Sequence, residues 1–389
     1  MRVYLDNNAT TPLHPDVIKA VSDFLPYYGN PSSLHETGRD AKVKIDAAVK
    51  SITEFFGCPR EDMIITSCAS ESNNIILKSF MNKKYDFKPH MIISAIEHPA
   101  ILETAKYMES NGFDLSLAPV NEDGVVEVDT IKNLIRKETV LISVMWVNNE
   151  IGTVQPVEEI GNLAKDKNIF FHVDAVQAAG SIPISFKDLP FDSAAISAHK
   201  MYAPKGIGLL YVKNFAKRKK DLTPLIHGGH QEGGFRAGTE NTIGIAAFGA
   251  ACSVLSQEMK QNHEREEKIR DHFEDRIQKE IPHIIINGKN AKRKVSTSNI
   301  TFKFIEGESI LLRLDLHGIS VSTGSACSTG SLDPSHVIMA LSDDKERAHG
   351  SIRFSFGREN TMEEADYVVD KLKETVAFLR SISPLYKGE

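Results

Sequence analysis

Short hydrophobic runs recur between residues 63 and 212, separated by stretches of mixed polarity. Four of them are apolar at nearly every position, which is typical of strands buried on both faces of a sheet. Two shorter runs also predict strands, at 63–66 (MIIT) and 194–196 (AAI). The four longer runs are 91–94 (MIIS), 140–145 (VLISVM), 169–173 (IFFHV) and 208–212 (GLLYV).

Amphipathic helices are predicted between these runs. One apolar stripe at helical spacing lies in residues 45–56, and another begins at 75–77. Strands that alternate with helices need crossover connections, which favour a parallel sheet. The sequence therefore predicts an α/β fold whose large domain is a mostly parallel sheet flanked by helices.

The last third of the chain has a different character. Residues 255–281 are rich in charge, with apolar side chains at four-residue steps, and predict a long surface helix that links two domains. The pattern Thr361-Met362-Glu363-Glu364 is a capping box and predicts the start of a final helix. The linking helix and the final helix together predict a smaller α/β domain at the carboxy-terminal end.

The length of 389 residues exceeds what one hydrophobic core usually organises, so two domains are expected. We assign residues 13–258 to the large domain. Residues 1–12 and 259–389 are assigned to the small domain.

The charge balance of the chain argues against two classes of function. Charged residues make up 25% of the chain and hydrophobic residues 41%, as in ordinary globular proteins, and the net charge is −6. An acidic chain argues against nucleic-acid binding and against a basic membrane face. Two basic clusters, 217–220 and 292–294, are expected to be solvated turns.

The amino terminus shows no signal-peptide pattern, and no apolar stretch approaches the ~18 residues of a membrane helix. The four cysteines are widely spaced and form no Cys-x-x-Cys pair. Neither a disulfide framework nor a zinc site is therefore indicated, and a cytoplasmic location is expected.

Two chemically capable side chains follow predicted strands. Lys200 comes after the run 194–196, and Asp174 comes directly after 169–173. Ligands collect at the carboxyl ends of strands in open α/β sheets, where a lysine can form a Schiff base with a carbonyl cofactor. Taken singly, the lysine has a plain interpretation as a surface residue and the aspartate as a turn cap.

Together the two residues suggest pyridoxal phosphate. That cofactor needs a carboxylate facing its ring nitrogen, because the protonated ring is the electron sink. Asp174 suits this role, and Gln177 lies three residues on, where its side chain can reach the phenolic oxygen. Residues 67–72 form a polar turn before a helix, which suits a phosphate dianion or an ordinary helix cap.

Three more residues are candidates with open alternatives. His98 follows the strand 91–94 and can stack on a flat ring, or be structural. Arg353 alternates with apolar neighbours in 350–356, so it either holds a substrate carboxylate or forms a salt bridge. Cys327 is flanked by small polar residues, which favours an exposed nucleophile over a buried structural thiol.

These motifs resemble the cysteine desulfurases of the NifS/IscS kind, in the fold-type I, class V branch of pyridoxal-phosphate enzymes. The resemblance extends through the whole chain, and the segment 331–337 (SLDPSHV) is similar to the group with a long cysteine loop, here about 322–335. Cys68 and Ser70 stand where glycine and threonine are common. The matching blocks are 4–12 (YLDNNATTP), 29–33 (GNPSS), 97–98 (EH), 148–152 (NNEIG), 172–175 (HVDA), 197–200 (SAHK), 236–239 (RAGT) and 322–327 (STGSAC).

The resemblance implies a role for each candidate. Lys200 would bind the cofactor covalently and move the Cα proton, and Cys327 would accept the sulfur of L-cysteine as a persulfide while L-alanine leaves. The substrate carboxylate would be held by Asn149 and Arg353. Cofactor contacts would come from Ala69, Ser70, His98, Asn149, Asp174, Gln177, Ser197 and His199, and from Thr239 of the partner subunit in a homodimer.

The resemblance also implies an acceptor for the sulfur, an iron–sulfur scaffold protein of the IscU/NifU kind. No resident metal is expected, although Cys327 would meet an acceptor's cluster transiently. Three alternatives remain at this point. An aminotransferase of the same fold would not need Cys327, a selenocysteine lyase would prefer selenium, and a non-catalytic scaffold would bind no cofactor.

Overall fold

Seven strands form one large sheet in the computed structural model, which describes residues 1–324 and 334–387. Their order is β2-β8-β7-β6-β5-β3-β4, and neighbours are parallel except where β8 runs antiparallel to β2 and β7. The mostly parallel sheet predicted from the sequence is thus confirmed. The strands are β2 (Met63–Thr66), β3 (His90–Ser94), β4 (Asp114–Ala118), β5 (Thr139–Ser143), β6 (Phe170–Asp174), β7 (Ser193–Ser197) and β8 (Gly208–Val212).

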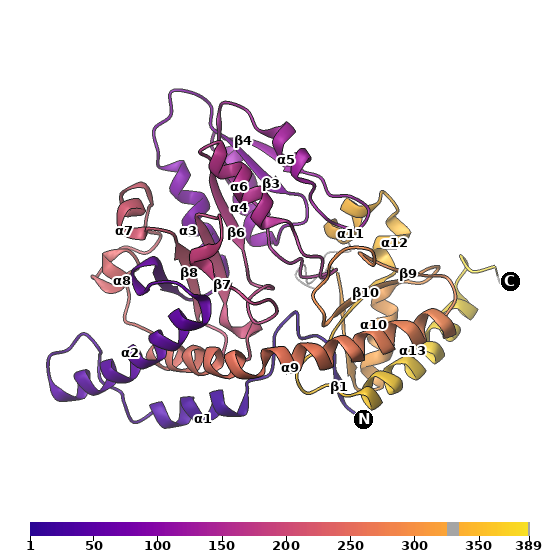
Figure 1. Ribbon diagram of the computed structural model, residues 1–389. Coiled ribbons are helices and arrows are strands. Elements are labelled where there is room, and N and C mark those ends of the chain that lie inside the picture. The colour runs from indigo at the N-terminus through magenta and orange to yellow at the C-terminus, as the bar shows by residue number, and fades with distance from the viewer. Residues whose placement is uncertain (325–333, 388–389) are drawn as a thin grey trace.

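Helices cover both faces of this sheet, as Figure 1 shows. Because side chains alternate along a strand, Ile92 faces one layer while Met91 and Ile93 face the other. The layer on the side of Met91 contains α3 (Ala69–Met81) and α4 (Pro99–Ser110). The layer on the side of Ile92 contains α1 (Pro15–Phe24), α2 (Glu36–Phe56), α5 (Val128–Leu134), α6 (Val157–Asp166) and the first part of α9.

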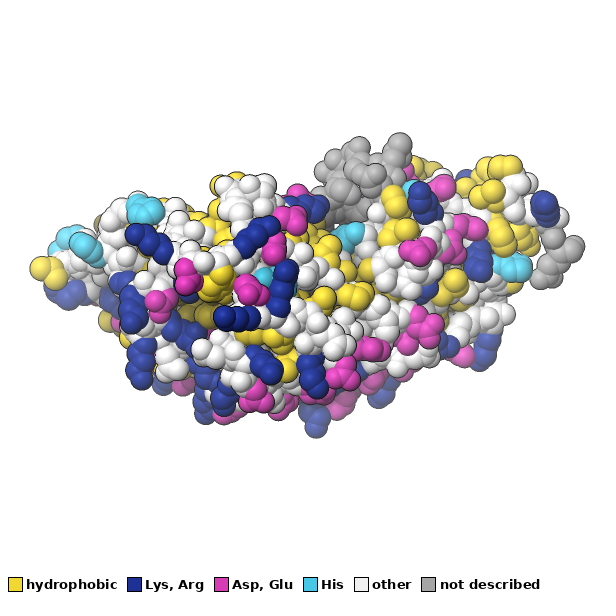
Figure 2. Space-filling model, turned by 90° about the horizontal axis from the view of Figure 1, so that it is seen from above, with side chains coloured by type: hydrophobic (Ala, Val, Ile, Leu, Met, Phe, Trp, Pro, Cys, Tyr) yellow, Lys and Arg dark blue, Asp and Glu magenta, His cyan; other side chains and the backbone are white. Residues whose placement is uncertain are grey.

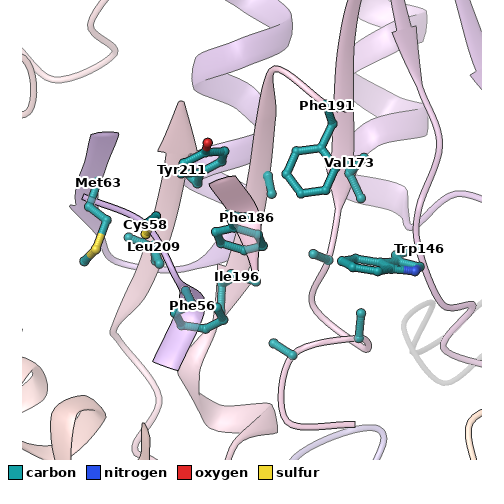
Figure 3. Packing of buried hydrophobic residues seen from close by; sticks show 14 of the residues in the cluster. Phe56, Cys58, Met63, Trp146, Val173, Phe186, Phe191, Ile196, Leu209 and Tyr211 are labelled. Carbon is teal, nitrogen blue, oxygen red and sulfur yellow. The ribbon is translucent and has the colours of Figure 1, made fainter. Parts of the chain in front are cut away.

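Aromatic rings fill the layer under α2. Phe56 stacks on Phe186 with ring centroids 5.1 Å apart, and Phe191 packs edge-on against both Phe186 and Trp146. Figure 3 shows Phe186 and Phe191 between the strands that carry Tyr211 and Val173. Such close packing makes the strand ends of the sheet a rigid base for side chains placed there.

One helix, α9 (Thr242–Glu280), contributes to two hydrophobic cores. Its first part packs in the large core through Ile245 and Leu255, and its last part packs in a second core through Ile269 and Phe273. Figure 1 shows α9 running along the base of both halves of the molecule. The helix begins earlier than predicted, and it is buried along one side instead of lying wholly on the surface.

The second core belongs to a four-stranded antiparallel sheet in the order β12-β13-β10-β9. The predicted capping box is confirmed, because the Thr361 side chain and the Glu364 carboxylate each accept the other residue's backbone N–H. The strands are β9 (Ile284–Ile286), β10 (Thr297–Phe302), β12 (Ser322–Thr323) and β13 (Ser351–Ser355), and the covering helices are α10 (Gly307–Leu316) and α13 (Met362–Ile382).

The first residues of the chain lie with this second sheet. Strand β1 (Val3–Tyr4) pairs in parallel with β11 (Ile319–Ser320), and Asp6 forms a β-bridge to Ser355. The segment after Asp6 then runs toward the large sheet. The remaining short helices are α7 (Phe215–Arg218), α8 (Gln231–Gly234), α11 (His336–Leu341), α12 (Lys345–His349) and the 3₁₀ turns Arg60–Asp62, Phe186–Asp188, Ala198–Lys200 and Lys219–Asp221.

Both basic clusters differ from the expected solvated turns. Residues 217–220 lie in α7 and the 3₁₀ turn after it, so they are helical. Arg293 has a side chain only 7% exposed, and its guanidinium forms paired hydrogen bonds of 2.8 and 2.9 Å with the Glu274 carboxylate. The prediction for 292–294 is therefore wrong for Arg293, because a buried carboxylate binds it.

The surface carries charges of both signs. Figure 2 shows basic side chains with acidic ones among them, and hydrophobic side chains between. Among the described residues, no helix is both long and apolar enough to cross a membrane.

Candidate active site

A cavity of about 320 Å³ lies at the carboxyl ends of β6 and β7, beside the amino terminus of α3. It brings together side chains from both domains, as expected where ligands bind to an open α/β sheet. Of the candidates named from the sequence, those lining it are Ala69, Ser70, His98, Asn149, Asp174, Gln177, Ser197, His199, Lys200 and Arg353.

Two candidates are not among the lining residues. Thr239 is exposed and lies away from this chain's own cavity. Cys327 falls outside the described residues.

Asp174 is held by a chain of buried hydrogen bonds. Its Oδ2 accepts from Asn73 Nδ2 at 2.8 Å, and Asn73 Oδ1 lies 2.9 Å from His172 Nε2. Since Asn73 uses its oxygen toward His172, the histidine must carry its proton on Nε2 and accept from Ser193 Oγ at Nδ1. Burial lowers the pKa of His172 to about 3, so the ring is neutral, as this arrangement requires.

Lys200 ends the 3₁₀ turn after β7 and reaches the amino-terminal segment. Its Nζ donates to the backbone oxygens of Asn8 at 2.5 Å and Ala9 at 2.6 Å. Gln177 Nε2 donates to the same Asn8 oxygen at 2.9 Å. The lysine and the glutamine are therefore held side by side at the wall of the cavity.

The amino terminus of α3 forms the opposite end of the cavity. Its N-cap residue, Cys68, makes no side-chain capping hydrogen bond, so the cap leaves amides of the first turn at Ala69 and Ser70 available to an anion. His199 lies there too, with Nδ1 3.1 Å from Thr10 Oγ1, and burial together with nearby lysines lowers its pKa to about 4. A neutral imidazole can donate to a phosphate without adding charge.

His98 is the N-cap of α4, and its Nδ1 accepts from the backbone N–H of Ala100 at 3.1 Å. Burial lowers the pKa of His98, although Asp174 opposes this shift, so the ring is neutral at physiological pH. A neutral ring fixed at one nitrogen has a flat face that can stack against a planar ligand.

Arg353, in β13, brings a cation from the small domain. Its guanidinium donates to Asp6 Oδ1 at 2.7 Å and to the backbone oxygen of Asn149 at 3.1 Å. The side chain is 4% exposed. The salt bridge considered from the sequence is therefore present, with Asp6, but Arg353 is buried at the cavity wall instead of lying on the surface.

Four residues at or beside the cavity were not singled out from the sequence. Asn8 and Asn73 line the cavity, and Lys294 donates to Asn8 Oδ1 and Gln177 Oε1. The Glu150 carboxylate accepts a hydrogen bond from Ser335 Oγ at 2.5 Å, and Ser335 follows Cys327 in the sequence. Only Asn8 and Glu150 stood in matched sequence blocks; an asparagine inside a helix and a lysine among basic residues give no signal of their own.

The cavity fits the cofactor expected from the sequence. Its lining combines the uncapped amino terminus of α3, which suits a phosphate, with the buried Asp174 carboxylate and Lys200. Among residues 1–324 and 334–387, no group of three His, Cys, Asp or Glu side chains is arranged to hold a metal ion. The polar groups that line the cavity suit an organic phosphate because they combine free amides of a helix amino terminus with a lysine and a carboxylate.

Comparison with known proteins agrees with this chemistry. The class-V aminotransferase family model matches residues 3–368. Cysteine desulfurase IscS of Dictyoglomus turgidum is 44% identical over all of this chain and 97% of its own length, and that of Methanosarcina thermophila is 43% identical over all of this chain and 95% of its own.

Solved structures show the same fold. A NifS-like protein superposes with a TM-score of 0.89 at 36% identity, covering 97% of this chain and all of its own. SspA in complex with cysteine superposes with a TM-score of 0.80 at 33% identity, covering 92% of this chain and all of its own. The chain belongs to the class-V aminotransferases, a pyridoxal-phosphate-dependent family, and within it to the cysteine desulfurases of the NifS/IscS kind.

Proposed function

We propose that this protein converts L-cysteine to L-alanine with bound pyridoxal phosphate and transfers the sulfur to Cys327. The observation that carries the proposal is the convergence of Asp174, Lys200 and Arg353 in one cavity, in a chain closely similar to cysteine desulfurases. Each of the three supplies a different requirement of the reaction.

The cofactor would be held at both ends. Asp174 would face its ring nitrogen, Gln177 its phenolic oxygen and His98 its ring face, and Lys200 would bind it covalently. When bound, the cofactor supplies an electron sink for the bonding pair released at the substrate Cα. The phosphate contacts come from Ala69, Ser70, Ser197 and His199.

The substrate would be bound through its carboxylate. Arg353 offers a guanidinium that is already oriented by Asp6 and by the Asn149 backbone, so little side-chain entropy is lost on binding. Lys200, once the substrate amine has replaced it on the cofactor, would take the Cα proton, and the backbone oxygens of Asn8 and Ala9 would keep its ammonium form close to the reacting carbon.

Sulfur transfer balances without any further oxidant. The Cys327 thiolate attacks the substrate sulfur, the bond between Cβ and sulfur breaks, and the carbon keeps the electron pair and gains a proton. One L-cysteine and one thiol thus give one L-alanine and one persulfide.

The test is a single turnover followed by mass spectrometry. One equivalent of L-cysteine is mixed with the cofactor-loaded protein, and the peptides are mapped. We expect about 32 Da on the peptide that contains Cys327 and one equivalent of alanine. Conversion of the cofactor to its amine form with no added sulfur would refute the proposal and favour transamination.

Other thiols of the same chain serve as internal controls. Cys58 and Cys252 are buried, and burial raises their thiol pKa, to about 12 for Cys58, so both should stay unmodified. Cys68 lines the cavity and is the informative position. Sulfur found first on Cys68, and on Cys327 only later, would overturn the assignment of the nucleophile.

The protein is proposed to act as a homodimer in which Thr239 reaches the partner's phosphate site. Large apolar side chains are exposed near the amino terminus, with Tyr28 at 85%, Leu34 at 90% and Val43 at 66%. Exposed apolar groups in one region favour an interface. Co-expression of Lys200→Ala and Thr239→Ala chains should give mixed dimers with one intact site; no recovery of activity over either variant alone would contradict a shared site.

The acceptor is proposed to be an iron–sulfur scaffold protein of the IscU/NifU kind, in the cytoplasm. Transfer of ³⁵S from the loaded protein to a purified scaffold should require Cys327. Equal labelling of an unrelated protein that contains thiols would argue against a specific acceptor.

A further inference from the structure

Lys294 lies behind the cavity, and its ammonium group is enclosed. The residue was expected in a solvated turn, yet its Nζ donates to Asn8 Oδ1 at 2.9 Å and to Gln177 Oε1 at 3.1 Å. Asn8 and Gln177 are 1% and 3% exposed. A partly buried lysine whose ammonium group contacts two buried amides calls for an explanation, because desolvating an ammonium group is costly.

The backbone around Lys294 is anchored on the turn that carries Asn149. Its N–H donates to the Gly152 oxygen at 2.7 Å, and its own oxygen accepts from Thr297 N–H at 3.2 Å. The opposing charge comes from Glu266 in α9, which lines the same small cavity as Lys294 and Lys200. The lysine is therefore fixed in place from several sides.

Burial lowers the pKa of Lys294 to about 8, and the Glu266 carboxylate opposes that shift. The two contacts of Nζ with amide oxygens are those of a donor, as the ammonium form requires. An ammonium group has three donors and no acceptor, so an amide beside it must present its oxygen. Both side-chain amides are consequently fixed in one of their two orientations.

The fixed orientation has a consequence on the cavity side. With Oε1 toward Lys294, Gln177 Nε2 gives one hydrogen to the Asn8 backbone oxygen and keeps a second one. Gln177 also lines the main cavity, beside Lys200. Turning the amide over would place oxygen against oxygen at Asn8 and nitrogen against the ammonium group.

The same argument applies to Asn8. Its Oδ1 faces Lys294, so its Nδ2 donates to the Asn149 oxygen at 3.1 Å and to Thr297 Oγ1 at 2.9 Å. One ammonium group thus orients the wall beside Lys200 and also the turn that carries Asn149.

We propose that Lys294 is a positioning residue, which orients the Gln177 amide so that it donates a hydrogen bond to the phenolic oxygen of the bound cofactor. The proposal rests on the proposed function, because it needs the cofactor in this cavity. It assigns to Lys294 no contact with substrate or cofactor.

The test compares Lys294→Met, which keeps the length but loses the donors, with Lys294→Arg, which keeps donors. Lys292→Met removes a neighbouring exposed lysine and is the matched control. The readouts are the dissociation constant of pyridoxal phosphate and the pH midpoint of its visible absorbance. We expect Lys294→Met to weaken cofactor binding about tenfold, with the control unchanged and Lys294→Arg intermediate.

The pH midpoint should rise in Lys294→Met, because a phenolate that loses a donor holds its proton more strongly. A double-mutant cycle with Gln177→Leu then separates positioning from general damage to the fold. In that background, the further change Lys294→Met should alter cofactor affinity less than twofold. The same tenfold loss in both backgrounds would overturn the proposal.

Folding is checked by thermal unfolding of each cofactor-free variant. If Lys294→Met unfolds because Glu266 is left unpaired, the cycle is repeated with Glu266→Gln present throughout. An unsubstituted protein that binds no pyridoxal phosphate would overturn the proposed function and this inference together. Additive effects in a protein that does bind the cofactor overturn this inference alone.

Discussion

The hydrogen-bond chain behind Asp174 can be tested at Asn73. In Asn73→Ala, Asp174 loses its donor on Oδ2 and keeps only the Val176 backbone N–H on Oδ1, and the His172 Nε2–H loses its acceptor. A hydrogen bond to a charged group contributes about 1.5–3 kcal/mol, and a buried unsatisfied donor costs about 1–3 kcal/mol. We expect a loss of about 3–5 kcal/mol in the free energy of unfolding.

That loss converts to a shift in melting temperature. Unfolding entropy near 2.1 cal/mol/K per residue gives about 0.8 kcal/mol/K for 389 residues, if the two domains unfold together. Asn73→Ala should therefore melt about 4–6 °C lower in differential scanning calorimetry of the cofactor-free protein. Asn82→Ala, at the exposed end of the same helix, is the control and should change little.

Cofactor binding provides the second assay of the same change. A less firmly held Asp174 should weaken pyridoxal phosphate binding, which is measured by titrating visible absorbance. The reasoning would be refuted if Asn73→Ala melted within about 1 °C of the control and bound the cofactor equally well. It would show that water replaces the asparagine at no cost.

Two further changes test other parts of the site. Burial raises the pKa of Glu97 to about 8, so the stability that its protonated form contributes is fully present below about pH 4.5 and is lost as pH rises through about 8. The melting temperature of Glu97→Gln, relative to that of the unsubstituted protein, should therefore be higher at pH 9 than at pH 6. The same difference in melting temperature at both pH values would contradict this. A Cβ on Gly324 would lie 2.3 Å from Glu150 Oε2 and 2.9 Å from Ser335 Cβ, so Gly324→Ala should cost about 1–3 kcal/mol and slow single-turnover sulfur transfer. An unchanged rate of sulfur transfer, measured by quenched flow, would show that the close contact of Gly324 with Glu150 and Ser335 has no functional role.

Hydrophobic patterning predicted much of the fold because the central strands are buried on both faces. The edge strand β4 (Asp114–Ala118) was missed, since its half-exposed positions mix charged and apolar residues. The early start of α9 was missed because small residues from Thr242 onward carry no amphipathic stripe. The local hydrophobic pattern is least informative at the edge of a sheet, as in β4, and in a helix that joins two cores, as in α9.

The site was predictable where a residue's chemistry is carried by its place after a strand, as for Asp174 and Lys200. It was not predictable where a residue acts through another. Asn73 and Lys294 contact side chains of the cavity lining that come from distant parts of the sequence, and nothing near them in the chain signals those partners. Sequence reasoning even assigned Lys294 to solvent, since basic clusters usually are solvated.

The pairing of the first strand has a consequence for synthesis on the ribosome. Val3 pairs with Ile319 and Asp6 bridges to Ser355, so residues 3–6 must wait for their partners until residues 319–355 have been made. At about 5–20 residues per second, that delay is roughly 15–70 s. The wall that Asn8 contributes beside Lys200 is absent during this time. A nascent chain should therefore acquire its cofactor only once residues 319–355 have been made, and chains stalled before residue 319 should capture none.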